Sequence, residues 1–442
     1  MVTSRISDLP APLPRAEISV DRSLRRTSRL LGLLRGSHNG QTAPHRIALV
    51  TPYPVRDQQS ISGVASYSRE FVRALVKFDL DLEVWAERTF PESTEPDHVP
   101  AQVIRAWRAG LWAGLDLWRM LRARRPAVLH VQIEYFIFGG WLGFISLLSF
   151  LVAARFTRTK VFATAHQVLS LAGLRRQVLR EFGVRLPAHV ARVLVHLSTA
   201  LLGRVTDRII VHEEVFRSRL IEEYQINPAR VEIINHGVPE VPGDPPAQRS
   251  KRILLFGYLK WYKGIDIALR AFCEVATEFP DWKLIIAGGL PAGLGEGHPH
   301  IRFYNYLRAL SHQLGKRVEF LGYVGDAAIP ELFRQADLVL FPYRVLFSAS
   351  GPLALAIGYR KAFIISEPLR PILPTWPFWC PNSPDRWAQT LRRLMGDEAV
   401  IAHAEILADL LKSTRTWPDT ARQIARRYGA VESLVPVADH SP

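Results

Sequence analysis

The segment RILLFGYLKWYKGIDIALRAFCEVATEFPDWKLIIAGG, residues 252–289, contains the pattern that decides the fold. An apolar run, RILLFG, is followed by a short loop, a helical stretch from Ile265 to Phe279 and a second apolar run, WKLIIAGG. A strand, a helix and another strand in this order form a βαβ unit, whose two strands are parallel. The segment therefore predicts an α/β domain built on an open, doubly wound sheet.

The same alternation continues on both sides of this segment. The runs RVEFLG, ADLVLFPY and AFIIS are predicted strands that follow it, and RIALVTPYP, LDLEVWAE, AVLHVQIE, KVFATAH and RVTDRIIVHE are predicted strands that precede it. Helices are predicted at Gly63 to Leu75 and Leu111 to Arg122. Between the two series lies VPEVPGDPPAQRSK, whose prolines and glycines are typical of a linker. The chain is thus predicted to hold two Rossmann-like domains.

We divide the chain as follows: a basic N-terminal extension at 1–45, a first domain at 46–240, a linker at 241–250, a second domain at 251–400 and a C-terminal helical segment with a tail at 401–442. Within the extension, residues 21–35 place leucines and arginines on opposite sides of a helix. That pattern predicts either a basic amphipathic helix for a lipid interface or a disordered tail, because so short a helix is marginal alone.

Composition restricts the possible partners. The 442 residues include 56 Lys and Arg against 41 Asp and Glu, a net charge of +15, which favours an anionic partner such as nucleic acid, a phosphorylated ligand or an acidic membrane. Two cysteines exclude a disulfide scaffold or a cysteine-rich zinc cluster. No nucleic-acid-binding signature is present, so we expect no nucleic acid. The first residues lack the apolar core of a signal peptide, so we expect the cytoplasm.

One stretch, Tyr135 to Ala154, has 20 residues without a charge and is nominally long enough to span a bilayer. Glycines interrupt its first half, and it lies between two predicted strands of one sheet. We therefore predict a loop and then a buried helix around Trp141 to Phe156. The alternative is an exposed apolar helix that touches lipid.

Lysines and a serine-glycine pair follow two predicted strands of the second domain, where open α/β sheets bind ligands. Lys260 and Lys263 come after RILLFG, and Ser348, Ser350 and Gly351 precede an apolar helix. An ammonium and the N–H groups of a helix start both favour a phosphate. Taken singly, solvated lysines and a simple serine cap explain these features equally well.

The first domain carries weaker signals of the same kind. Gly63 opens a predicted helix, which favours an anion or is simply part of a cap. His166 ends the strand KVFATAH and faces the cleft or is a satisfied structural histidine. Glu134, His236 and Ser348 are possible cleft or acceptor contacts, and for the first two a rim carboxylate and a turn cap are the alternatives.

In order and spacing, the chain from Arg46 to about Tyr428 resembles glycosyltransferase family 4. The stretches that carry the resemblance are ISGVASYSREF, VLHVQIEY, VFATAHQV, RIIVHEE, VEIINHGV, LFGYLKWYKGIDIALRAF, RVEFLGYV, ADLVLFPY and SASGPLALAIGYRKAFIIS. The resemblance implies a GT-B fold, with two Rossmann-like domains facing each other across a cleft. It also implies that the end of the chain, within 401–442, packs back toward the first domain.

The activity implied is a retaining, metal-independent hexosyl transfer, of mannosyl or glucosyl type, from a nucleotide diphosphate sugar. No cofactor is expected. The donor would lie against the second domain and the acceptor against the first. By resemblance, Gly63 lies near the donor phosphates, His166 hydrogen-bonds the donor sugar and Lys263 binds the diphosphate. Ser350 and Gly351 would begin the phosphate-binding helix, and Gly257, Tyr258 and Lys260 would also lie at the donor phosphates.

The chain also departs from the family pattern. Tyr258, after the strand glycine Gly257, stands where the family often has an arginine, with Lys260 in a compensating position. Two family glutamates correspond to Ser348 and Ala356, although the second usually holds the nucleotide ribose. This loss favours an alternative class, a non-catalytic GT-B scaffold or partner subunit.

Arginines crowd the first domain on both sides of the uncharged stretch. Basic charge beside apolar area is typical of proteins that bind the cytoplasmic leaflet. We therefore expect a polysaccharide, oligosaccharide or lipid-linked acceptor and peripheral contact with an anionic membrane. A basic enzyme without membrane contact is the alternative.

Overall fold

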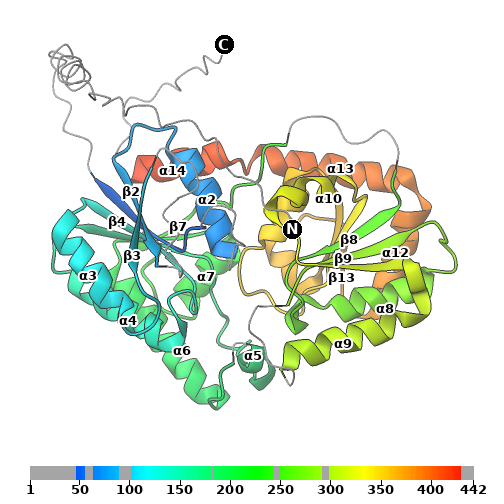
Figure 1. The fold of residues 1–442 in the computed structure, drawn as a ribbon, viewed down its shortest axis with the longest axis horizontal. Helices are drawn as coiled ribbons and strands as arrows, with labels where there is room; N and C mark the ends of the chain where they lie inside the picture. The colour runs from blue at the N-terminus through cyan, green and yellow to red at the C-terminus, as the bar shows by residue number, and fades with distance from the viewer. Residues whose placement is uncertain are drawn as a thin grey trace, which may run out of the picture. The chain divides into compact units, whose positions relative to one another are not determined.

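The computed structural model contains two parallel sheets flanked by helices (Figure 1) and describes residues 46–54, 63–88, 101–181, 183–241, 249–290 and 298–429. The predicted extension at 1–45 and most of the predicted linker lie outside these residues. The prediction of two α/β domains with parallel sheets is confirmed. We call the two halves, each with its sheet, the first lobe and the second lobe.

The first sheet has seven strands in the order β3-β2-β1-β4-β5-β6-β7. In chain order they are β1 (Ile47–Val50), β2 (Leu82–Glu87), β3 (Gln102–Trp107), β4 (Val128–Ile133), β5 (Lys160–Ala165), β6 (Arg208–Val211) and β7 (Val231–Ile233). The sequence did not predict β3 or β7. Strand β6 is shorter than predicted, because Arg204 and Val205 end the preceding helix.

Helices connect these strands. They are α2 (Gly63–Leu75), α3 (Ala113–Arg124), α4 (Gly140–Ala154), α5 (Arg176–Glu181), α6 (Ala188–Val205) and α7 (Glu214–Glu222). Helix α4 forms where a buried helix was predicted, with Phe144, Leu147 and Leu151 in the core. Within the described parts of the chain, no helix has the length and apolar character needed to cross a membrane.

The second sheet has six strands in the order β10-β9-β8-β11-β12-β13. They are β8 (Arg252–Phe256), β9 (Lys283–Ala287), β10 (Val318–Gly322), β11 (Leu338–Phe341), β12 (Ala362–Ser366) and β13 (Trp379–Cys380). The main helices are α8 (Ile265–Val275), α9 (Pro299–Ser311), α10 (Ile329–Arg334) and α11 (Gly351–Gly358). Strand β8 pairs with both β9 and β11, so the loops after β8 and β11 leave the same edge as neighbours.

The chain passes between the lobes twice. Helices α12 (Pro384–Gly396) and α13 (Glu398–Ser413) follow β13, and α13 packs on α11 and β12. Helix α14 (Trp417–Arg427) instead packs on α2, and its Ala421 and Ile424 join the core of the first lobe. The two passages meet in a parallel bridge between Val238 and Thr416.

A glycine allows this meeting to be close. A Cβ added to Gly237 would lie 2.2 Å from the ring of Trp417, so only glycine fits under the first residue of α14. The N–H of Val238 donates to the carbonyl of Arg415 over 2.7 Å. The two passages are therefore fastened to each other.

Candidate active site

The loop after β8 is shaped to hold a lysine against the end of β11. Gly264 has φ +64, and a Cβ on it would lie 1.8 Å from the carbonyl oxygen of Pro342. Arg344 binds both carboxylate oxygens of Asp266, at 2.8 and 2.7 Å, and donates to the carbonyl of Trp261 over 2.8 Å. This bidentate pair ties the loop to α8 and to the segment after β11.

Lys263 begins a chain of contacts that ends at α11. Its Nζ donates to the hydroxyl of Tyr343, and that hydroxyl lies 3.0 Å from Oγ of Ser350. Burial lowers the pKa of Lys263 to about 7 and raises the pKa of Tyr343. The site thus holds an amine that gains its charge most readily when an anion arrives.

Helix α11 begins beside this amine. Ser350 is its N-cap, with Oγ accepting the N–H of Leu353 over 3.3 Å. Pro352 has no N–H, so the N–H of Gly351 is the group that the first turn offers a ligand. A Cβ added to Gly257 would lie 3.6 Å from Pro352 and 3.8 Å from Nζ of Lys263. The structure therefore brings these predicted residues together.

The first lobe presents a buried group of imidazoles at the end of its strands. The rings of His166, His212 and His236 lie 4.5, 5.3 and 5.0 Å from the ring of Tyr67 on α2. Burial lowers the pKa of His212 to about 4, that of His236 to about 3 and that of His166 well below its usual value. All three imidazoles are neutral at pH 7.

Neutral rings fix the direction of the hydrogen bonds around His166. Nδ1 of His212 donates to the carbonyl of Ile234 over 2.9 Å, so Nε2 of His212 must be an acceptor. Nδ1 of His166 donates to it over 3.4 Å, which makes Nε2 of His166 an acceptor too. Its partner at 2.7 Å is the side-chain amide of Gln132, which must then turn its NH₂ toward the ring. Both nitrogens of His166 are thus engaged within the lobe.

The two clusters come close because the lobes touch beside them. Gln167, which follows His166, forms an antiparallel bridge with Ser348, two residues before the N-cap of α11. The N–H of Val168 donates to the carbonyl of Phe347 over 3.2 Å. Ser348 therefore joins the lobes next to both clusters.

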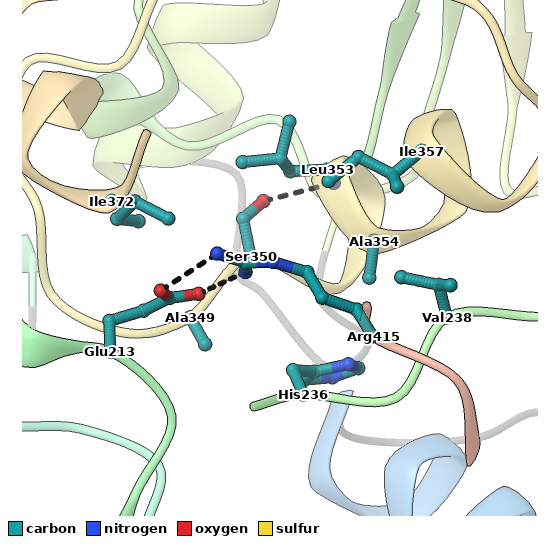
Figure 2. Close-up of a pocket in the computed structure, with 10 residues that line it drawn as sticks. All are labelled: Glu213, His236, Val238, Ala349, Ser350, Leu353, Ala354, Ile357, Ile372 and Arg415. Atoms are coloured by element: carbon teal, nitrogen blue, oxygen red, sulfur yellow. Dashed lines mark hydrogen bonds and ion pairs between the residues drawn. The ribbon is translucent and has the colours of Figure 1, made fainter. Parts of the chain in front are cut away.

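A pocket lies at this junction (Figure 2). Glu213 and His236 of the first lobe face Ser350 and Leu353 of α11 across it. Arg415 contributes from the second passage between the lobes and pairs with both oxygens of Glu213, at 2.6 and 3.2 Å. Burial raises the pKa of Glu213, although Arg415 opposes the shift. His236 thus lines a cleft as well as packing on Tyr67.

The remaining predicted residues lie around these clusters. Lys260 lies in the electrostatic field of Glu134 and Glu181 of the first lobe, and burial lowers its pKa. Burial likewise raises the pKa of Glu134, with Lys260 opposing the shift. The structure therefore places Lys260 in the field of first-lobe carboxylates, and its predicted phosphate contact stays a prediction.

Three further positions singled out from the sequence have different surroundings. Burial raises the pKa of Tyr258, and the neighbouring Tyr323 and Asp326 add to the shift. Gly63 is the exposed first residue of α2, one turn before Tyr67. Ala356, in the place of a family glutamate, is fully buried, so this position offers a core methyl group instead of a ribose contact. Within the described ranges, no group of three His, Cys, Asp or Glu side chains is arranged to hold a metal ion.

Sequence reasoning missed several residues of the site. Tyr343 ends the stretch ADLVLFPY, and its place directly after a strand was a usable signal. Tyr67 and His212 lie in quoted motifs, but nothing local in them indicates a shared cluster. Arg344 and Asp266 are far apart in the chain, so their pairing follows only from the neighbouring strands β8 and β11.

Two family descriptions match the sequence. Glycosyltransferase Family 4 matches residues 61–240, and Glycosyl transferases group 1 matches residues 250–397. The D-inositol 3-phosphate glycosyltransferase of Mycolicibacterium gilvum (strain PYR-GCK) is 23% identical, over 92% of each chain. That of Mycobacterium bovis (strain BCG / Pasteur 1173P2) is 26% identical, over 68% of this chain and 64% of its own.

Solved structures share the fold. Sucrose-phosphate synthase from Thermosynechococcus elongatus superposes with a TM-score of 0.65 at 17% identity, covering 87% of this chain and 98% of that one. Anabaena HepE in complex with UDP and glucose gives a TM-score of 0.63 at 16% identity, covering 88% and 100%. The expected GT-B arrangement is thereby confirmed.

Proposed function

The chain belongs to the glycosyltransferases of family 4 and group 1 with the GT-B fold, and we propose that it transfers a sugar from a nucleotide diphosphate sugar with retention of anomeric configuration. The observation that carries this proposal is the chain of contacts from Lys263 through Tyr343 to Ser350 at the start of α11. Two structural neighbours that hold UDP, one with glucose and one as UDP-glucose, support a nucleotide sugar as donor.

The second lobe supplies charge for the leaving group. As the bond between the sugar C1 and the phosphate oxygen breaks, negative charge develops on the diphosphate. The ammonium of Lys263 and the N–H of Gly351 meet that charge from two directions, so we propose that no metal ion is needed. Preorganised contacts of this kind are commonly worth a hundredfold or more in rate.

The first lobe supplies neutral hydrogen-bonding groups for the sugar. A sugar hydroxyl that reaches His166 takes the place of the Gln132 amide at Nε2, where it donates its hydrogen. In a retaining transfer the acceptor hydroxyl attacks C1 from the face that the diphosphate leaves. Its proton passes to the departing phosphate oxygen as the new C1–O bond forms.

For the acceptor we propose a polysaccharide, oligosaccharide or lipid-linked sugar at the cytoplasmic face of the membrane. The excess of basic residues supports an anionic carrier. By their names, the curated relatives act on D-inositol 3-phosphate, which is also anionic. We propose a mannosyl or glucosyl donor.

A thermal-shift screen against uridine and guanosine diphosphate sugars tests the donor. A ligand at a hundred times its dissociation constant stabilises the fold by about 2.7 kcal/mol, so the true donor raises the melting temperature. NMR of the first product formed from that donor then reports the anomeric configuration. An inverted product contradicts the retaining assignment, and a screen without any shift contradicts the donor site.

The missing family glutamates favour one second candidate, a scaffold that binds a donor without turning it over. The same screen separates the two. Stabilisation by a donor that is neither hydrolysed nor transferred identifies the scaffold, whereas slow hydrolysis in the absence of acceptor identifies the enzyme.

A further inference from the structure

Large exposed apolar side chains lie on three helices of the first lobe, or one or two residues beyond them. We call Trp112, Leu142, Ile145, Phe156 and Leu197 the apolar face, and their exposed fractions are 56%, 58%, 56%, 87% and 59%. Helix α3 packs on α4 and α4 packs on α6, so the three helices form one layer against the sheet (Figure 1). Such a set of exposed large side chains marks an interaction surface.

The start of α3 is fixed beside α4. Oγ of Ser146 on α4 donates to the carbonyl of Leu111 over 2.6 Å and accepts the N–H of Gly114 over 2.9 Å. A Cβ on Gly114 would lie 2.2 Å from the carbonyl oxygen of Ser146, so the helices touch backbone to backbone. The backbone at Trp112 is therefore fixed beside α4, and the guanidinium of Arg108 lies over its ring at 5.4 Å.

Charge around the apolar face is strongly one-sided. Residues 101–205 contain fifteen arginines and lysines but only three acids, Asp116, Glu134 and Glu181. None of these acids is exposed, and Asp116, with 4% of its side chain exposed, is paired with Arg108. Two exposed arginines lie in the same segments of the chain, Arg158 two residues after Phe156 and Arg192 on α6. The surface is thus basic with apolar patches.

The dimensions of α4 fit a helix that lies on a bilayer. Its 15 residues extend about 22 Å, whereas the hydrocarbon core is about 30 Å thick. One side of α4, with Phe144, Leu147 and Leu151, is committed to the protein core. Only the opposite side is available to lipid, as in interfacial helices.

Helix α4 starts at the same edge of the first sheet as the candidate site. Helix α4 starts at Gly140, six residues after Glu134 at the end of β4. Since a crossover helix starts at the edge where its strand ends, Leu142 and Ile145 lie toward the edge that also carries His166. A surface bound here brings its headgroups toward the site.

We propose that the apolar face and its arginines bind the surface of an anionic lipid bilayer. A second copy of the chain would bring two basic surfaces together, which repel each other. A nucleic acid would leave the apolar side chains uncovered. The use of a lipid-borne acceptor rests on the proposed function, whereas the binding itself does not.

Flotation of the full chain with vesicles tests this proposal. We expect binding to vesicles of equal parts phosphatidylglycerol and phosphatidylcholine, weaker binding at high salt, and little binding to phosphatidylcholine alone. The double variant Leu142→Ser/Ile145→Ser should lower the partition coefficient about tenfold or more. The matched control is Ile406→Ser/Leu410→Ser on α13, whose side chains are 61% and 63% exposed, and it should bind like the wild type.

A second pair of variants leaves the apolar side chains intact. Arg158→Ser and Arg192→Ser should each lower binding about fivefold, and neither side chain belongs to the core. Residues 1–45 are present in every protein compared, so their contribution cancels.

Two results would overturn the proposal: no vesicle binding by the wild type, or equal losses in the α4 variant and the α13 control. A wild-type dimer that the α4 variant disperses, without vesicle binding, would assign the face to a second copy. Hydrolysis of the donor should be unchanged in both double variants. If no protein hydrolyses a donor, the proposed function fails while the vesicle result stands.

Discussion

The polar groups at the strand ends differ in charge between the two lobes. In the first lobe, His166, His212 and His236 are neutral at pH 7 because burial lowers the pKa of each. In the second lobe, Lys263 lies beside the N-terminal end of α11, where positive charge accumulates. The difference matches the two ends of the proposed donor, whose sugar is neutral and whose diphosphate is anionic.

Burial changes the charge of the two clusters in different ways. Burial keeps the imidazoles neutral over the physiological pH range. The pKa of His212, for example, is only about 4. In Lys263, burial lowers the pKa only to about 7, so the amine can regain its charge when a diphosphate binds. The first lobe should therefore contribute orientation, and the second should contribute the response to charge.

Removal of the Lys263 amine should have the largest effect on activity. Lys263→Ala should lower the rate of transfer a hundredfold or more, because the leaving diphosphate loses its ammonium. The melting temperature should not fall, since the change also removes a buried amine with a lowered pKa. Initial rates and thermal unfolding measure the two effects.

Lys283→Ala is the matched control for this variant. Lys283 belongs to the same lobe, but it is exposed and paired with Glu319. We expect its rate to equal that of the wild type. Near-normal turnover by Lys263→Ala would refute the assignment of the amine.

Donor binding should depend on pH through the protonation of Lys263. Above the free pKa of Lys263, about 7, the amine must gain a proton before it can pair with a diphosphate. The affinity for nucleoside diphosphate should therefore fall with rising pH, by at most about tenfold per unit, and binding at pH 8 should take up a proton. Calorimetry in two buffers of different ionisation enthalpy measures this uptake.

The Lys263→Ala variant should show no such uptake. Between pH 5.5 and 9 the imidazoles of the first lobe stay neutral, so they should add no slope of their own. Above about pH 7.5, where the terminal phosphate of the nucleoside diphosphate is already ionised, an affinity that rises with pH would contradict the assignment of charge to the second lobe.

His166→Ala tests the orienting role of the first lobe. We expect kcat to fall about tenfold, the equivalent of one or two hydrogen bonds, while the affinity for nucleoside diphosphate stays constant. The comparison predicts this split, because the ring does not belong to the diphosphate cluster. Loss of diphosphate affinity in this variant would show that the first lobe also binds the diphosphate.

Ser350→Ala should have the smallest effect. The change removes the N-cap of α11 and one partner of Tyr343, so we expect a loss of about 1 kcal/mol in the free energy of unfolding. Ser350→Thr retains a capping oxygen and should lose less. Denaturant titration of both variants measures the difference.

The second lobe was the more predictable half. RILLFGYLKWYKG and SASGPLALAIG are each contiguous, and the parallel topology alone places their ends together. The network of the first lobe joins Gln132, His166 and His212, which come from three neighbouring strands. No local pattern encodes those pairings, so only the assembled sheet reveals them.

The missed strands have a physical explanation as well. β3 lies at the edge of its sheet, and its first residues are exposed or half-buried, so its sequence lacks a continuous apolar run. β7 has three residues, too few for a periodic signal. The long helix α6 also extends into a run that resembles the start of a strand.

The placement of α14 makes a segment that follows the second lobe responsible for the integrity of the first lobe. Its Ile424 and Tyr428 fill the core beside α2, and the hydroxyl of Tyr428 lies 2.5 Å from Nδ1 of the buried His130. A protease that cuts after Ser413, or a premature stop codon there, would uncover the lobe that is synthesised first while sparing the one just completed. During translation, the first lobe can complete its core only after the whole second lobe has been synthesised.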